Sequence, residues 1–89
     1  MSHRVLLHPR AAEFLKRSQG KTSKRIKERL KELEEEPEEK GERLRHSPFY
    51  RLRIGDHRAI YMVEEETGRV IILFIGHRRE VYDDFSRLF

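Results

Sequence analysis

The sequence predicts an α+β fold, in which a helical hairpin packs on a small, mainly antiparallel sheet of four strands and a short helix ends the chain. Apolar residues recur at helical spacing between residues 9 and 37. Apolar and basic residues then alternate from residue 50 to 54, and residues 70 to 75 are all apolar. The resulting order is β-α-α-β-β-β-α. The 89 residues suffice for one domain, residues 1–89, with a modest core.

The first strand is expected from Arg4 to His8, where Pro9 closes it and starts a helix, because proline suits a first helical position. Gly20 is expected to stop this helix. One face of the helix carries the residues that we expect to be buried: Ala11, Phe14, Leu15 and Ser18.

A second helix is expected to begin near Thr22 or Ser23, either of which can cap it, and to end by Pro37. Its buried stripe consists of Ile26, Leu30 and Leu33. The first half of this helix is basic and its end is acidic, which opposes the helix dipole at both ends. We therefore expect the two helices to pair as a hairpin against the sheet, and we favour a solvated structural face over a binding role for the second helix.

The C-terminal half is expected to form three strands. Tyr50 to Ile54 and His57 to Val63 flank a two-residue turn, and a second turn lies at Glu65 to Gly68. The continuous apolar run from Val70 to Ile75 indicates a central strand that is covered on both faces. The last helix presents a stripe that looks exposed in the sequence: Val81, Phe85, Leu88 and Phe89.

Five arginines lie between Arg43 and Arg58, a segment with one acid, Asp56, and they account for the net charge of +4. A two-residue turn places Arg53 opposite Arg58, and Arg51 shares their face of the sheet. Because opposed like charges destabilise a sheet, we expect an anion on this face, and the guanidinium fork suits phosphate. The alternative is an ordinary solvated strand face, or pairing with the acidic end of the second helix.

The composition excludes several classes of function. The chain has no cysteine, so disulfides and thiolate metal sites are absent, and its longest apolar run has six residues. We therefore expect a cytoplasmic location. The 40% of charged residues is typical of thermophilic sources, including archaeal ones. The histidines show no metal-ligand spacing and no hydrolase or nucleotide motif is present, so we expect neither metal nor cofactor.

Cleavage of RNA without a metal needs few groups from a protein, because the 2′-hydroxyl of the RNA is the nucleophile. Fixed cations must stabilise the phosphorane, and a general base and acid must move protons. The arginines supply the cations, and the titratable candidates near them are Tyr82, His77 and Glu80. Tyr82 also fits a purely structural place at the start of the last helix.

Two stretches resemble the RelE branch of the RelE/ParE toxin superfamily: YRLRIGDHRAIY from Tyr50 to Tyr61, and IGHRREVY from Ile75 to Tyr82. The resemblance implies a toxin that enters the ribosomal A site and cleaves mRNA, leaving a 2′,3′-cyclic phosphate and a 5′-hydroxyl. It also implies a cognate antitoxin that wraps the toxin with helices and restrains it. A related hypothesis is that an antitoxin helix displaces the last helix from an apolar groove.

The resemblance also implies roles for single residues. Arg51 and Arg53 match a basic pair that binds the scissile phosphate, and Arg58 matches an arginine that stabilises the transition state. Arg78 matches a residue that contacts phosphate or protonates the leaving group, and Tyr82 one that stacks on a base or acts as general base. Additional candidates are Arg45 and Arg79 for phosphate binding, and His77 and Glu80 for acid–base work.

Some members carry lysine in the basic pair. Arginine holds its proton more firmly, so the two arginines here give Tyr82 more weight as the base. A ParE-like inhibitor of DNA gyrase and a non-catalytic RNA-binding module are the alternatives. The complete set of arginines and tyrosine favours the RelE branch.

Overall fold

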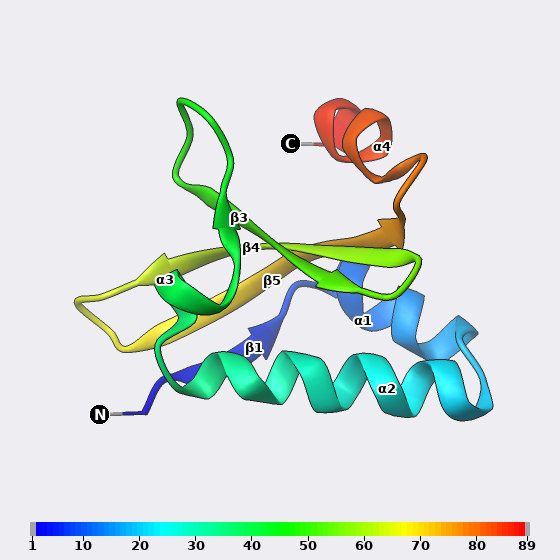
Figure 1. The fold of residues 1–89 in the computed structure, drawn as a ribbon, viewed down its shortest axis with the longest axis horizontal. Coiled ribbons are helices and arrows are strands. Elements are labelled where there is room, and N and C mark those ends of the chain that lie inside the picture. Colours follow the sequence, from blue (N-terminus) through cyan, green and yellow to red (C-terminus); the bar gives the residue numbers. More distant parts are fainter. Residues whose placement is uncertain (1, 89) are drawn as a thin grey trace.

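The computed structural model describes residues 2–88 and contains one sheet with helices on both of its faces (Figure 1). The strands are β1 (Arg4–Leu7), β2 (Glu42–Arg43), β3 (Phe49–Ile54), β4 (His57–Glu64) and β5 (Arg69–His77). The helices are α1 (Pro9–Arg17), α2 (Gly20–Lys31), α3 (Pro37–Lys40) and α4 (Val81–Leu88), and a 3-10 turn (Glu32–Glu34) follows α2. None of the helices in this described part is long and apolar enough to cross a membrane.

The strand order in the sheet is β1-β5-β4-β3-β2, with β1 parallel to β5 and every other pair antiparallel. The predicted α+β class is therefore confirmed, but the sheet has five strands where four were expected. The additional strand is β2, which lies between the second predicted helix and the strand predicted from Tyr50, where no element was expected. Its two residues are too few to show an alternating pattern.

Both N-terminal helices pack on the same face of the sheet, as the predicted hairpin requires, but their boundaries differ from the expectation. The His8 side chain accepts a hydrogen bond from the backbone of Arg10 at the start of α1, and α1 ends at Arg17. Gly20 opens α2 and does not stop α1. The expected caps at Thr22 and Ser23 are thus wrong, because both residues lie inside α2.

Two apolar cores lie on opposite faces of the sheet. The larger core joins the sheet to α1 and α2, and includes Leu15 and Ile26 from the helices. The smaller core joins the sheet to α4, whose Val81 and Phe85 are buried. The expectation of an exposed C-terminal stripe is therefore wrong for these two residues, whereas Leu88 is 40% exposed. Phe89, the last member of that stripe, lies outside the described residues.

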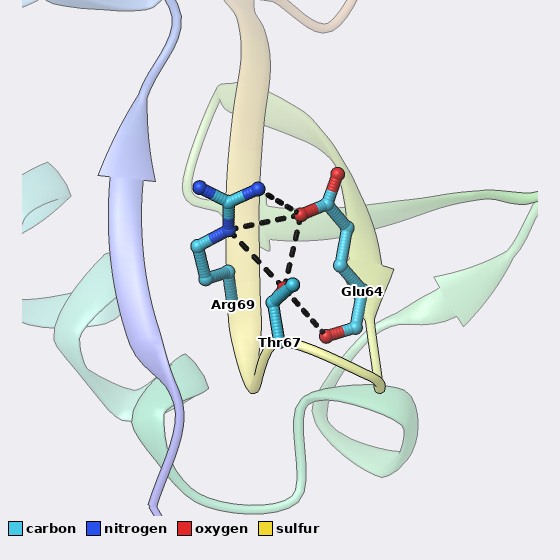
Figure 2. Close-up of polar contacts among 3 residues, drawn as sticks. All are labelled: Glu64, Thr67 and Arg69. Atoms are coloured by element: carbon cyan, nitrogen blue, oxygen red, sulfur yellow. Dashed lines mark hydrogen bonds and ion pairs between the residues drawn. The ribbon is translucent and has the colours of Figure 1, made fainter.

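The hairpin between β4 and β5 turns at residues 65 to 68, as expected. Figure 2 shows that one carboxylate oxygen of Glu64, Oε1, accepts hydrogen bonds from Arg69 Nε at 2.9 Å, Arg69 Nη2 at 2.7 Å and Thr67 Oγ1 at 3.1 Å. The hydrogen bond from Arg69 holds the pKa of the Glu64 carboxyl below its usual range. This network links the end of β4 to the start of β5. A shift in the pairing register between Ile60 and Tyr61 separates this end of the ladder from the end at which Arg58 lies opposite Gly76.

Candidate functional site

The hairpin of β3 and β4 has the predicted register. Arg53 lies opposite Arg58, and Ile54 opposite His57. Gly55, the first turn residue, has a φ of 60°, which glycine adopts without strain at this position of a two-residue turn. Leu52 and Ile54 are buried in the larger core, so Arg51 and Arg53, which alternate with them along β3, project from the opposite face. We call this surface, formed by Arg51, Arg53 and Arg58, the arginine face.

Arg58 is held at the turn by backbone carbonyl groups. Its Nη1 donates hydrogen bonds to the carbonyl oxygen of Gly55 at 2.8 Å and to that of His57 at 2.7 Å. On the other side of β4, Arg58 lies opposite Gly76 of β5, which has no side chain to cover it. The positive charge of Arg58 is thus fixed in position, and within residues 2–88 no hydrogen bond or ion pair joins it to a carboxylate.

Arg78 is brought to the same turn. Its backbone N–H donates to the carbonyl oxygen of Asp56 at 2.8 Å, and its Nε lies 4.0 Å from the Asp56 carboxylate. Both side chains are mostly exposed, so this ion pair is weak and leaves the guanidinium available. The loop after β5 therefore adds a fourth arginine beside the turn that joins the two strands of the arginine face.

Tyr82 reaches the arginine face from the first turn of α4. Its hydroxyl oxygen accepts a hydrogen bond of 2.7 Å from Arg51 Nη1, and the guanidinium carbon of Arg51 lies 5.9 Å from the centre of the Tyr82 ring. The ring is thus within range of a cation–π interaction. The contact joins two residues that are 31 positions apart in the sequence.

Glu42 also belongs to this site, and sequence reasoning missed it. It lies in β2 opposite Arg51, whose Nη2 donates a hydrogen bond of 2.6 Å to the carboxylate. Arg51 lowers the pKa of Glu42, with smaller contributions from Arg53 and Arg58. In turn, Tyr82 and then Glu42 raise the pKa of Arg51. Only the pairing of β2 with β3 creates this contact, and so short a strand leaves no signal in the sequence.

Within residues 2–88, four other predicted site residues make no hydrogen bond, ion pair or ring contact with the arginine face or with the turn residues Gly55 and Asp56. His77 contacts His57, with ring centres 6.0 Å apart, and His57 contacts Phe14 of α1. The two histidines therefore lie on the face of the sheet that α1 and α2 cover. Arg45 is exposed in the loop between β2 and β3, at the opposite end of β3 from the turn. Arg79 and Glu80 are exposed in the turn before α4.

The geometry provides fixed cations and a phenol on one open surface. A phosphate placed there would be surrounded by guanidinium donors, which stabilise negative charge that develops on its oxygens. Within residues 2–88, no group of three or more histidine, cysteine, aspartate or glutamate side chains is arranged to hold a metal ion.

A comparison with protein families matches residues 5–82 to the family described as the ParE toxin of the type II toxin–antitoxin system parDE. The match covers both strands of the arginine face and extends to Tyr82. The chain belongs to the RelE/ParE superfamily of type II toxins. No curated protein matches this toxin significantly in sequence.

Solved structures of RelE toxins share the fold of this RelE/ParE toxin. The archaeal RelE–RelB complex from Pyrococcus horikoshii matches with 30% identity and a TM-score of 0.71, over 88% of this chain and 97% of that chain. The toxin–antitoxin complex RelBE2 from Mycobacterium tuberculosis matches with 25% identity and a TM-score of 0.80, over 88% and 100%. A mutant of the E. coli toxin RelE in the free state matches with 25% identity and a TM-score of 0.80, over 100% of both chains.

Proposed function

We propose that this toxin is a metal-independent endoribonuclease that cleaves mRNA in the ribosomal A site and thereby inhibits translation. The observation that carries the proposal is the contact between Arg51 and Tyr82 on a surface that also holds Arg53 and Arg58. This surface combines the fixed positive charge and the titratable oxygen that metal-free RNA cleavage requires.

In the proposed reaction, the 2′-hydroxyl oxygen attacks the neighbouring phosphorus while the bond from phosphorus to the 5′-oxygen breaks. The products are a 2′,3′-cyclic phosphate and a 5′-hydroxyl. Arg51 and Arg53 bind the scissile phosphate, and Arg58 stabilises the charge of the phosphorane, since all three project from the arginine face. Tyr82 stacks on a base or accepts the proton of the 2′-hydroxyl, and Arg78 contacts the phosphate or protonates the leaving oxygen.

A cognate antitoxin is the proposed partner, together with the ribosome and its mRNA in the cytoplasm. The similar toxins from Pyrococcus horikoshii and Mycobacterium tuberculosis were solved as complexes with their antitoxins. For this chain we propose a toxin–antitoxin hetero-oligomer in which helices of the antitoxin wrap the toxin. Displacement of α4 by such a helix would expose the smaller core and carry Tyr82 away from Arg51, which would inactivate the site.

Inhibition of DNA gyrase is the second candidate function, because the matching family is described as ParE. The presence of Arg51, Arg53, Arg58, Arg78 and Tyr82 together favours the nuclease. A third alternative, an RNA-binding module without catalysis, predicts binding that weakens with salt and no cleavage.

Primer extension on a defined mRNA in programmed ribosomes tests the proposal. We expect the wild type to produce a stop within the A-site codon, and we expect Arg78→Ala and Tyr82→Phe to abolish or strongly reduce it. Arg17→Ala, which removes an exposed arginine of α1, is the matched control and should cleave like the wild type. An intact message with the wild-type protein would contradict the proposal, and a gyrase supercoiling assay would then test the second candidate.

A further inference from the structure

Glu42 is placed against the arginine face by tight packing of the backbone just before it. Gly41 precedes Glu42, and a Cβ atom at Gly41 would collide with the hydroxyl of Tyr61 and with the carbonyl oxygen of Arg51. The absence of a side chain there lets β2 lie close to β3, in the register that sets Glu42 opposite Arg51. The contact between the two side chains is therefore determined by the fold of the backbone around it.

The guanidinium group of Arg51 is already occupied in the free protein. Nη1 donates to the hydroxyl of Tyr82, and Nη2 donates to the carboxylate of Glu42. The third nitrogen, Nε, is buried and has no hydrogen-bond partner within residues 2–88. A phosphate that binds Arg51 must therefore compete with one of these two acceptors. Of the two, Glu42 carries a charge.

All three arginines of the arginine face contribute to the electrostatic potential at the Glu42 carboxylate. The pKa of its carboxyl is lowered chiefly by the hydrogen bond and charge of Arg51, and further by the charges of Arg53 and Arg58. Glu42 is thus ionised at neutral pH and is attracted by the same three arginines that the proposed function assigns to the phosphate. A carboxyl whose pKa is lowered is also a weaker proton acceptor, which argues against a role as general base.

We propose that Glu42 is an internal ligand of the arginine face, whose carboxylate occupies the position on Arg51 that a phosphate of the RNA takes when it binds. The inference rests on the proposed nuclease function. Carboxylate and phosphate both accept charge-assisted hydrogen bonds from a guanidinium, so either anion satisfies Arg51. When RNA binds, the Glu42 side chain, which is already 60% exposed, swings into solvent.

The exchange sets which anions can bind. An internal ligand competes at an effective concentration that is roughly millimolar or higher, so a single free phosphate ion displaces it poorly. An RNA chain presents several phosphates to Arg53, Arg58 and Arg78 at once, and these contacts compensate for the displacement of Glu42. The toxin is thereby selective for polyanions over the small phosphates of the cell.

Binding of a short 2′-O-methyl RNA oligonucleotide, which lacks the nucleophile and is not cleaved, tests the inference. Glu42→Gln keeps the shape of the side chain and removes its charge. We expect this variant to bind the oligonucleotide about 3- to 10-fold more tightly than the wild type. Glu39→Gln is the matched control, since Glu39 is exposed on α3 and the variant makes the same change in net charge. Its gain should be smaller than twofold.

Glu42→Asp provides a second variant, with unchanged charge but an arm that is too short to keep the bond to Arg51. It should also bind more tightly than the wild type, and thermal melts followed by circular dichroism check that each variant is folded. Equal gains for Glu42→Gln and Glu39→Gln, or no gain for either Glu42 variant, would overturn the inference. So would a loss of mRNA cleavage by Glu42→Gln without tighter binding, since the carboxylate would then take part in proton transfer.

The two hypotheses fail in different ways. If the wild type leaves mRNA intact on the ribosome while Glu42→Gln still binds the oligonucleotide more tightly, the nuclease proposal fails and the internal ligand stands. If the wild type cleaves but neither Glu42 variant gains affinity, the nuclease stands and the internal ligand is wrong.

Discussion

The hydroxyl of Tyr82 accepts a hydrogen bond of 2.7 Å from Arg51 Nη1, and this contact joins α4 to β3 across the smaller core. The position of Tyr82 at the arginine face thus depends on the packing of α4, because Val81 next to it is fully buried. A displacement of α4 would separate the phenol from the guanidinium. Because the ring and the hydroxyl of Tyr82 make different contacts with Arg51, substitutions can test their roles separately.

Tyr82→Phe removes the hydroxyl and keeps the ring. We expect cleavage to fall by about 10²-fold or more if the hydroxyl moves a proton, since general acid–base groups contribute on that scale. Stability should change by no more than about 1 kcal/mol, the contribution of one part-exposed hydrogen bond. Single-turnover cleavage on programmed ribosomes and urea unfolding measure the two effects. Tyr82→Ala removes the ring as well, and equal activity of Tyr82→Phe and wild type would assign the role to stacking.

Arg58→Ala removes the guanidinium that the carbonyl groups of Gly55 and His57 hold at the turn. The expected loss of cleavage is about 10²- to 10³-fold, the scale found when one preorganised donor to a transition state is removed. The free energy of unfolding should stay the same or rise, because Arg53 no longer faces a like charge. Arg17→Ala is the control for net charge. A loss of cleavage that simply follows a loss of folded protein would contradict this prediction.

The sequence predicted those parts of the fold and site that depend on local pattern. The register of Arg53 against Arg58 follows from the length of the turn and the alternation of side chains, and it was correct. The strand β2 and the position of Glu42 were missed, because two polar residues carry no periodicity and their pairing is set by distant packing around Gly41. The position of His77, on the face of the sheet that α1 and α2 cover, was also not predicted.

Gly41→Ala tests the close approach that positions β2. The added Cβ would collide with the Tyr61 hydroxyl and the Arg51 carbonyl oxygen, one of which belongs to rigid backbone. We expect a loss of about 1–3 kcal/mol in the free energy of unfolding, as for overpacked interiors. Gly68→Asn is the comparison, since no atom lies within 4 Å of a Cβ there and asparagine tolerates its φ of 66°. Urea titrations of both variants that gave equal, small losses would refute the steric argument.

Tyr61 links stability to alkaline pH. The side chain of Tyr61 is fully buried, and its hydroxyl donates a hydrogen bond to the carbonyl oxygen of Pro37. Burial is the largest cause that raises the pKa of this hydroxyl from 10 to about 12. The unfolded chain therefore releases this proton near pH 10, whereas the folded chain keeps it until about pH 12. Between these values the unfolded state binds fewer protons, so the free energy of unfolding falls as the pH rises.

Tyr61→Phe removes this dependence. At pH 8 the variant should be less stable by about 1 kcal/mol, because the Pro37 carbonyl loses its donor. At pH 11 the free energy of unfolding of the wild type alone should have fallen by about 1.4 kcal/mol because Tyr61 ionises in the unfolded chain. The difference in stability between the two proteins should therefore shrink or reverse. Urea unfolding of both proteins at the two pH values measures this change, and all other titrating groups cancel in the comparison. A difference that stayed constant would show that Tyr61 ionises equally in the folded and unfolded chains, and a difference that widened would show that folding lowers its pKa.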